Sequence, residues 1–264
     1  MTMQLPPIDL HAHISPKASP AELERLGAVV FAATRSIAEF ESVMNRRDQV
    51  TVWGLGCHPG VQQAQSAFDS ARFTALLSTT AYVSEVGIDG RSRVAMDTQV
   101  RVLRSILESL QSAPRITSIH SSGAPGTVLE ILERHRTKGA VLHWWRGDKK
   151  QTRRALELGC WFSVNAAGMK YPADVAAIPL DRVLTETDHP TGDRGSTSPT
   201  QPGAVGDVET ALAQLHGLAA TAVRRQVWLN FARLAHAVGV VELLPLPVRR
   251  MLAAARGPDP SPRT

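Results

Sequence analysis

The strongest constraint on this fold is a regular alternation between short apolar runs and longer amphipathic stretches. The apolar runs are three or four residues long, which suits strands buried inside a sheet. The stretches between them have the apolar spacing of helices that cover such a sheet. Eight strands are predicted in this way, over residues 8–10, 29–32, 50–53, 81–83, 116–119, 140–142, 161–164 and 182–185.

The intervening segments carry helix signals. Ser19, Pro20 and Glu22 are typical of a capped helix start with proline in the first turn. Further helices are predicted over 98–110, 125–136 and 149–158, with glycine at positions 27, 139 and 159 where helices end. Strand followed by helix, repeated eight times, predicts an α/β fold: a TIM-type (β/α)8 barrel over residues 1–244. An open doubly wound sheet is the alternative.

Two segments lack this alternation. Residues 189–206 are rich in Gly, Pro, Ser and Thr, and predict a long mobile loop. Residues 245–264 contain five prolines and the pair Arg249-Arg250, and predict a partly disordered C-terminal tail.

The composition is that of a globular protein, with 43 % hydrophobic and 20 % charged residues. No apolar stretch approaches the ~20 residues that span a bilayer. The N-terminus has no basic flank before an apolar run, so we expect no signal peptide. Because Cys57 and Cys160 are the only cysteines, we expect no disulfide framework and a cytoplasmic location.

The net charge is +5, and residues 133–264 supply the whole excess. Most of the cations are arginines, whose guanidinium groups bind phosphate oxygens in pairs. This balance is compatible with a polyanionic partner, and equally with ordinary solubilising charge.

Histidines and carboxylates recur at the ends of the predicted strands. They are His11, His13, Glu85, His120, His143 and Asp188. In a (β/α)8 barrel the C-terminal ends of all strands open on one face, where active sites lie. The two histidines of the His-x-His pair point to the same side of an extended backbone. Taken singly, each residue has an ordinary explanation, such as a turn cap or a core histidine. Taken together, they predict a metal site.

Histidine and carboxylate without thiolate suit zinc, manganese, iron or a magnesium-like ion. Six ligands exceed what one tetrahedral ion needs, so we expect one or two ions, with two sharing a bridge. None of the five lysines ends a predicted strand, which leaves Glu85 as the bridging candidate. Two neighbouring ions can stabilise both the attacking and the leaving oxygen of a phosphoryl displacement.

Seven ordered motifs resemble those of TatD-type metal-dependent deoxyribonucleases, and the resemblance covers residues 8–235. The motifs are Ile-Asp-Leu-His11-Ala-His13, Gly56-Cys57-His58-Pro59, Ser84-Glu85-Val86-Gly87-Ile88-Asp89, Ile119-His120-Ser121, Leu142-His143-Trp144, Thr185-Glu186-Thr187-Asp188 and Asn230-Phe231-Ala-Arg233-Leu234. Within the family, residues 141–164 and 179–188 are most similar to QatD, the TatD-type component of the four-component Qat anti-phage defence system.

The resemblance implies a TIM-type barrel that hydrolyses DNA phosphodiester bonds with a metal-activated water. It implies that Glu85 lies between two ions, and that Asp188 both binds metal and acts as the base. His58 would lie near the scissile phosphate, or serve as a turn histidine beside Pro59. The implied ligand sets are His11, His13 and Asp188 for one ion, and His120 and His143 for the other. The implied partners are DNA, single-stranded or at its ends, and the proteins of a Qat-type complex.

Two positions depart from the family pattern. Ser122 stands where the family commonly has arginine, and Gly60 where it often has a second histidine. Arg146 or Lys149 on a following loop would then contact phosphate, and Trp144 would offer a stacking surface for an unpaired base. The basic run there is alternatively the exposed face of a helix.

These departures leave two alternative functions. One is hydrolysis of a different phosphoester or amide, such as a modified nucleotide or a nucleic-acid conjugate. The other is a catalytically weak interaction subunit of the defence complex.

Overall fold

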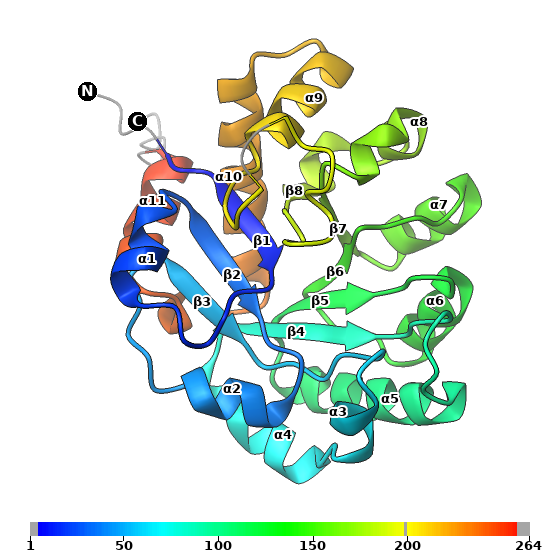
Figure 1. The fold of residues 1–264 in the computed structure, drawn as a ribbon. Helices are drawn as coiled ribbons and strands as arrows, with labels where there is room; N and C mark the ends of the chain where they lie inside the picture. The colour runs from blue at the N-terminus through cyan, green and yellow to red at the C-terminus, as the bar shows by residue number, and fades with distance from the viewer. Residues whose placement is uncertain (1–4, 198–199, 258–264) are drawn as a thin grey trace, which may run out of the picture.

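The computed structural model describes residues 5–197 and 200–257. Within these ranges, parallel strands lie at the centre and helices surround them (Figure 1). The strands are β1 (Ile8–Ala12), β2 (Val29–Ala33), β3 (Thr51–Gly54), β4 (Tyr82–Gly87), β5 (Ile116–His120), β6 (Ala140–His143), β7 (Trp161–Val164) and β8 (Val183–Thr185). Each of them overlaps one predicted run, which confirms the strand prediction.

The strands close into a ring. Continuous parallel ladders join β1 to β2 and β3, and join β4 through to β8 in sequence order. Leu55, just after β3, forms a bridge with Val83 of β4. On the other side, the Thr185 hydroxyl donates to the Ile8 carbonyl at 2.6 Å and links β8 to β1. The structure is therefore a TIM-type barrel, as predicted, and not an open sheet.

Helices cover the outside of this ring. They are α1 (Pro20–Arg25), α2 (Ile37–Val43), α3 (Gln62–Ser66), α4 (Ser70–Leu76), α5 (Met96–Ser112), α6 (Pro125–Arg134), α7 (Lys149–Glu157), α8 (Pro172–Val175), α9 (Gly206–His216), α10 (Ala220–Ala237) and α11 (Leu246–Arg256). The predicted capping box is present at α1, where Ser19 accepts from the Glu22 N–H and the Glu22 carboxylate accepts from the Ser19 N–H. The helices predicted over 98–110, 125–136 and 149–158 are α5, α6 and α7. Across the described ranges, no helix combines bilayer-spanning length with a sufficiently apolar sequence.

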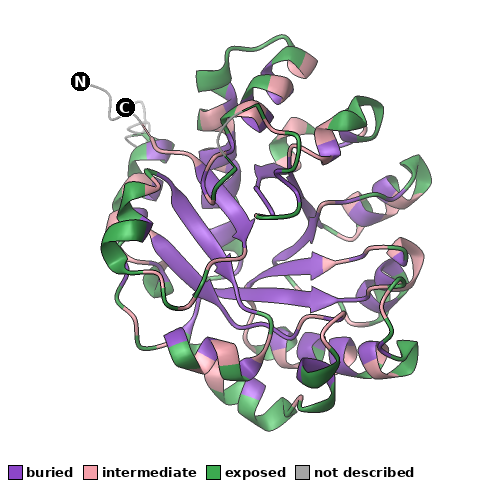
Figure 2. Ribbon diagram, viewed as in Figure 1, coloured by how far each residue is buried: buried purple, intermediate pink, exposed green. Residues whose placement is uncertain are grey.

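The core lies within the barrel and between the barrel and its helices. The strands are buried almost throughout, whereas the outer faces of the helices are exposed (Figure 2). Phe31 of β2 contacts both Tyr82 of β4 and Phe231 of α10 in edge-to-face geometry, which helps to hold α10 against one end of the ring. Gly87 ends β4 with φ +144°, and a Cβ there would lie 2.1 Å from the His120 carbonyl oxygen. Glycine thus lets β4 and β5 approach closely where both approach the site.

Residues 245–264 are predicted to form a partly disordered tail. Within that range, residues 246–256 form α11, which buries Val248, Leu252 and Ala255. The prolines of this segment precede the helix or lie in its first turn, where proline is tolerated. The rest of the predicted tail, residues 258–264, lies outside the described residues.

The described residues of the segment 189–206 form no strand, and helix α9 begins only at the last residue of the segment. The Gly203 N–H donates to Asp9 Oδ2 at 2.7 Å, and His189 Nδ1 lies 2.7 Å from Asp193 Oδ2. Part of this loop is therefore hydrogen-bonded to β1, and part is held by contacts within the loop. Residues 198–199 lie outside the described residues, and the mobility of the loop stays a prediction.

Candidate metal centre

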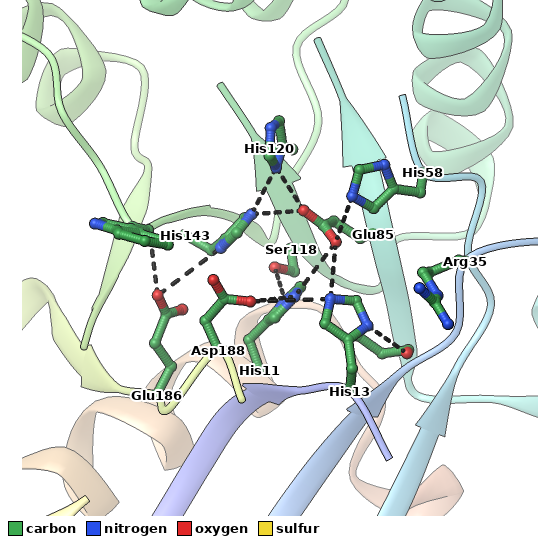
Figure 3. A network of polar contacts seen from close by, with 12 residues as sticks. His11, His13, Arg35, His58, Glu85, Ser118, His120, His143, Glu186 and Asp188 are labelled. Carbon is green, nitrogen blue, oxygen red and sulfur yellow. Dashed lines mark hydrogen bonds and ion pairs between the residues drawn. The ribbon is translucent and has the colours of Figure 1, made fainter. Parts of the chain in front are cut away.

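The side chains expected at the strand ends meet at one mouth of the barrel. Figure 3 shows them pointing toward one another from different strands. They are His11 from β1, His13 from just after β1, Glu85 from β4, His120 from β5, His143 from β6 and Asp188 from just after β8. The parallel direction of the strands brings them together, because each chain reaches the same edge at its C-terminal end.

Glu85 lies at the centre of this group. Its Oε1 is 2.5 Å from His120 Nδ1 and 2.9 Å from His143 Nε2, and these two nitrogens are 3.1 Å apart. Its Oε2 is 3.3 Å from His13 Nε2 and 3.6 Å from His11 Nε2. The two oxygens of one carboxylate therefore face different histidine pairs, which is the arrangement needed for a carboxylate shared between two cations.

Asp188 completes the side of the cluster formed by β1. Its Oδ1 lies 3.8 Å from His11 Nε2 and 3.9 Å from His13 Nε2. Its backbone has φ +46°, a left-handed conformation that is costly for a residue with a side chain. The Asp188 N–H donates to the His11 carbonyl at 2.8 Å, so contact with β1 helps to hold this conformation.

Hydrogen bonds at the far ring nitrogens distinguish the histidines. His13 Nδ1 donates to the Ala33 carbonyl at 3.2 Å, so the neutral ring presents a bare Nε2 to the cluster. His58 is the opposite case. The Gly60 N–H donates to His58 Nδ1 at 2.8 Å, so the neutral ring carries its proton on Nε2, 3.3 Å from Glu85 Oε2. By distance His58 belongs to the cluster, but this tautomer makes it a proton donor rather than a metal ligand.

Burial and mutual charge shift the ionisation of the cluster. Burial opposes ionisation of Glu85, but the charges of His58, His120 and His143 outweigh it and hold the pKa of Glu85 well below its usual range. Burial raises the pKa of Asp188 to about 8. Burial also opposes protonation of His143, yet the charge of Glu85 outweighs it and raises the pKa of His143 well above its usual value. At neutral pH the metal-free cluster therefore holds protons on Asp188 and His143.

The cluster contains polar atoms that protein groups leave unsatisfied. Among the described residues, His11 Nε2 and Glu85 Oε2 are buried and have no hydrogen-bond partner. Each such atom costs about 1–3 kcal/mol unless another group satisfies it. Three overlapping sets have ligand atoms within 4.8 Å of one another: His11, His13 and Glu85; His11, His143 and Asp188; and His58, Glu85 and His120. Imidazole nitrogens with carboxylate oxygens are ligands for divalent cations, so the residues present fit one or two such ions.

A second buried carboxylate, Glu186, supports His143 from behind. Its Oε1 accepts from Asn165 Nδ2 at 2.9 Å and from the Trp144 N–H at 3.0 Å, and lies 3.8 Å from His143 Nδ1. The Ser163 hydroxyl donates to its other oxygen. A carboxylate near the far nitrogen of a ligating histidine supports that ligand, and here the charge of Glu186 helps to raise the pKa of His143. Sequence analysis assigned no role to Glu186. The available signal is its position two residues before Asp188, beyond the end of the same strand.

The cluster forms the floor of a cavity of about 740 Å³, within the range of small-molecule sites. Its walls combine cationic, aromatic and hydroxyl side chains. These include Arg91, Ser122, Trp144, Arg146, Tyr171 and Thr191. The Arg146 guanidinium lies over the Tyr171 ring, 3.6 Å from its centroid, and this stacking fixes its plane.

The predicted substrate-binding residues fall into two groups. His58, Trp144 and Arg146 line the cavity, and their role in substrate binding stays a prediction. Lys149 does not: it lines a neighbouring groove between α7 and α8, because it begins α7 and the helix carries it away from the mouth. The cavity-lining Arg91 and Tyr171 were missed, since their loops carry no spacing that reveals where a side chain ends. Trp145 is a core residue, with Nε1 donating to Thr152.

The chain matches a known family over most of its length. The sequence model described as TatD related DNase matches residues 8–236. The chain is 29 % identical over 208 residues to the uncharacterized metal-dependent hydrolase YcfH of Escherichia coli K12, covering 74 % of this chain and 77 % of that protein. It is 34 % identical over 92 residues to deoxyribonuclease Tat-D of Schizosaccharomyces pombe, covering 31 % of this chain and 30 % of that protein.

Solved structures show the same fold. The TatD homolog YJJV of Escherichia coli K12 superposes with a TM-score of 0.75 at 22 % identity, covering 88 % of this chain and 98 % of that one. A TatD family hydrolase of Entamoeba histolytica gives a TM-score of 0.72 at 14 % identity, with coverage of 88 % and 98 %. With the matched span and the geometry described above, these similarities lead to one conclusion: the chain belongs to the TatD related DNase family and is a metal-dependent hydrolase of the TatD type.

Proposed function

We propose that this hydrolase cleaves DNA phosphodiester bonds, acting on single strands or strand ends. One observation carries the proposal: six histidine and carboxylate side chains converge at the mouth of the barrel, and five of them line a cavity whose walls hold Arg91 and Arg146. Cations on the walls attract a phosphate, and the floor offers ligands for the ions that phosphoryl displacement uses. The cavity is sized for a small molecule, which favours an unpaired strand or its end over an intact duplex.

The position of each residue suggests its role in the reaction. Glu85 would lie between two sites, with His11, His13 and Asp188 on one side and His120 and His143 on the other. Divalent ions there (Zn, Mn or Mg) would lower the pKa of water and neutralise charge on the phosphate. Asp188 would orient the attacking water and accept its proton. A water oxygen bonds to phosphorus, the bond from phosphorus to the leaving oxygen breaks, and that oxygen takes up a proton. His58, with its proton on Nε2, is placed to donate a hydrogen bond to the phosphate.

The test pairs metal content with cleavage. Protein purified without chelator should contain about one or two divalent ions per chain and should cleave single-stranded DNA. The Asp188→Asn and Glu85→Ala variants should lose cleavage while keeping the far-ultraviolet circular dichroism of the wild type. Full activity in either variant would contradict the assigned site. A Lys138→Ala variant serves as the control, because Lys138 precedes β6 at the end of the strand far from the site.

A second candidate function has an observation in its favour. Ser122 lines the cavity where the family commonly has arginine. Weaker phosphate binding at that point would suit a different phosphoester or an amide, such as a nucleic-acid conjugate. Turnover of such a compound, with no DNA cleavage under saturating metal, would favour this alternative.

We also propose a role in a Qat-type anti-phage complex in the cytoplasm. The similarity of residues 141–164 and 179–188 to QatD supports the complex, and the free, buried cysteines Cys57 and Cys160 suit a reducing compartment. Phage plaque assays with the Asp188→Asn variant test whether catalysis is needed. Loss of protection together with loss of metal supports an enzyme. Wild-type protection would instead support an interaction subunit.

A further inference from the structure

A line of basic side chains leaves the cavity along α7. Arg146 lines the cavity, and Lys149 and Arg153 line the adjoining groove between α7 and α8. The spacing of three and then four residues places the two helical members on one face. Lys149 and Arg153 are about 6 Å apart along the helix axis. We call Arg146, Lys149 and Arg153 the basic track.

The cavity and the groove are lined by residues that are close neighbours in the sequence. Arg146 stacks on Tyr171, and both residues line the cavity. Lys149 follows Arg146 by three residues and Ala173 follows Tyr171 by two, and these two residues line the groove. The groove holds about 420 Å³ and has an apolar floor of Leu156 and alanines. The groove therefore lies next to the part of the cavity that Arg146 and Tyr171 line.

The charges of the track are free to meet a ligand. Among the described residues, no carboxylate pairs with Lys149 or Arg153, and Arg146 is held by stacking alone. Their neighbour Arg154, on another face of α7, is instead paired with Glu133. Lys149 and Arg153 are exposed along their helix. A basic line without paired carboxylates, next to the candidate metal centre, fits the backbone of a polyanion.

We propose that the basic track binds the phosphates next to the scissile one, so that the protein binds an oligonucleotide more tightly than a dinucleotide or a small phosphoester. The proposal rests on the proposed function, because it uses the same cavity. Arg146 holds the phosphate nearest the metal centre, and Lys149 and Arg153 hold the following ones. The apolar floor of the groove and the exposed Tyr171 ring give unpaired bases a surface against which to pack.

Binding is measured separately from catalysis. The probe is a fluorescein-labelled oligothymidylate of about twelve nucleotides, titrated into Asp188→Asn protein at several salt concentrations. Adding Lys149→Ala and Arg153→Ala should weaken binding and make the slope of log K against log salt shallower by about 1.4, since each phosphate contact on a single strand contributes about 0.7. Adding Arg25→Ala and Lys138→Ala instead removes one arginine and one lysine at the opposite end of the barrel. This control should leave the slope unchanged.

Two outcomes would overturn the proposal. The first is a salt slope for the track variant equal to that of the Arg25→Ala, Lys138→Ala control. The second is displacement of the oligonucleotide by polyglutamate as effectively as by unlabelled DNA, which would show a general affinity for polyanions.

Cleavage then separates this proposal from the proposed function. In the otherwise wild-type protein, the track substitutions should lower kcat/KM for the oligonucleotide more than for a thymidine dinucleotide. Equal losses on both substrates would contradict the track and leave the nuclease intact. Failure of the wild-type protein to cleave either substrate would contradict the nuclease, while the binding result would still decide the track.

Discussion

Glu85 and Asp188 are both carboxylates in one buried cluster, yet their environments move their pKa values in opposite directions. Glu85 faces protonatable imidazoles on several sides, which favours its charged form. Asp188 lies at the edge of the group, where burial dominates and raises its pKa to about 8. The metal-free site therefore keeps one acid ionised and the other protonated near pH 7. A cation has to displace the proton on Asp188 in order to bind this carboxylate.

Metal affinity should accordingly increase with pH. Asp188 is protonated below a pKa of about 8, a metal needs the carboxylate, and so each binding event releases a proton. Calorimetric titrations between about pH 6 and pH 8, in buffers of different ionisation enthalpy, measure both the affinity and the released protons. The Asp188→Asn variant, which has no such proton, should show a weaker dependence. An affinity for the wild type that stays flat or falls over this range would contradict the assignment of Asp188 as a ligand.

Glu186 offers a prediction about positioning. Its carboxylate is 3.8 Å from His143 Nδ1 and is held by Asn165 and Trp144. Glu186→Gln keeps the size of the side chain but removes its charge, and should weaken metal binding by about 10–100-fold, as loss of such supporting groups does. Equilibrium titration with a metal indicator measures this directly. Replacing the exposed Glu157 by Gln is the control, and equal affinity in both variants would remove Glu186 from the site.

The sequence was sufficient to predict which ionisable residues meet at the strand ends. It was not sufficient to predict which other side chains line the cavity. Strand ends are readable because apolar runs stop where ionisable residues begin, as at His120 and His143. The direction of the Lys149 side chain could not be predicted, since it depends on where α7 starts relative to the cavity mouth. Arg91 and Tyr171 are brought to the cavity by loops, whose conformations follow from contacts between distant segments.

At the scale of elements, the strands could be predicted from the sequence, whereas the last helix, α11, could not. Eight buried strands have an apolar signature that few other structures share. Helix α11 was not predicted, because its prolines and paired arginines are typical of a disordered tail. Val248, Leu252 and Ala255 nevertheless recur at helical spacing. Proline counts against a helix only in its interior, and here the prolines lie at its start.

The packing of α11 can be tested by one buried and one exposed leucine. Leu252 is 2 % exposed and Leu246 is 50 % exposed. Leu252→Ala should lower the free energy of unfolding by about 2–5 kcal/mol, as loss of a packed leucine does. Leu246→Ala should change it by less than about 0.5 kcal/mol. Urea denaturation followed by circular dichroism compares the two. An equally small effect of both would mean that this segment contributes no packing.

At the scale of the whole molecule, the candidate ligands connect the two hydrogen-bonded ladders of the barrel. His11 belongs to the β1–β3 ladder and His13 directly follows β1, while Glu85, His120 and His143 belong to the β4–β8 ladder. Between them, β3 and β4 share no continuous ladder: a bridge at Leu55 and a hydrogen bond from the Cys57 N–H to the Glu85 carbonyl join the two segments. A cation held by both groups would therefore link the ladders at the mouth of the ring, and it would do so only in the folded protein.

Removing the metal should then lower the thermal stability of the barrel. Binding to the folded state alone stabilises it by about 2.7 kcal/mol at a hundred times Kd, which for a chain of this size raises Tm by roughly 5–10 °C. Differential scanning calorimetry of metal-loaded and chelator-treated protein measures the shift. Glu85→Ala removes the carboxylate that faces both ladders, so its Tm should not respond to metal. A wild-type Tm that is the same with and without chelator would show that these side chains do not bind the ladders together through a cation.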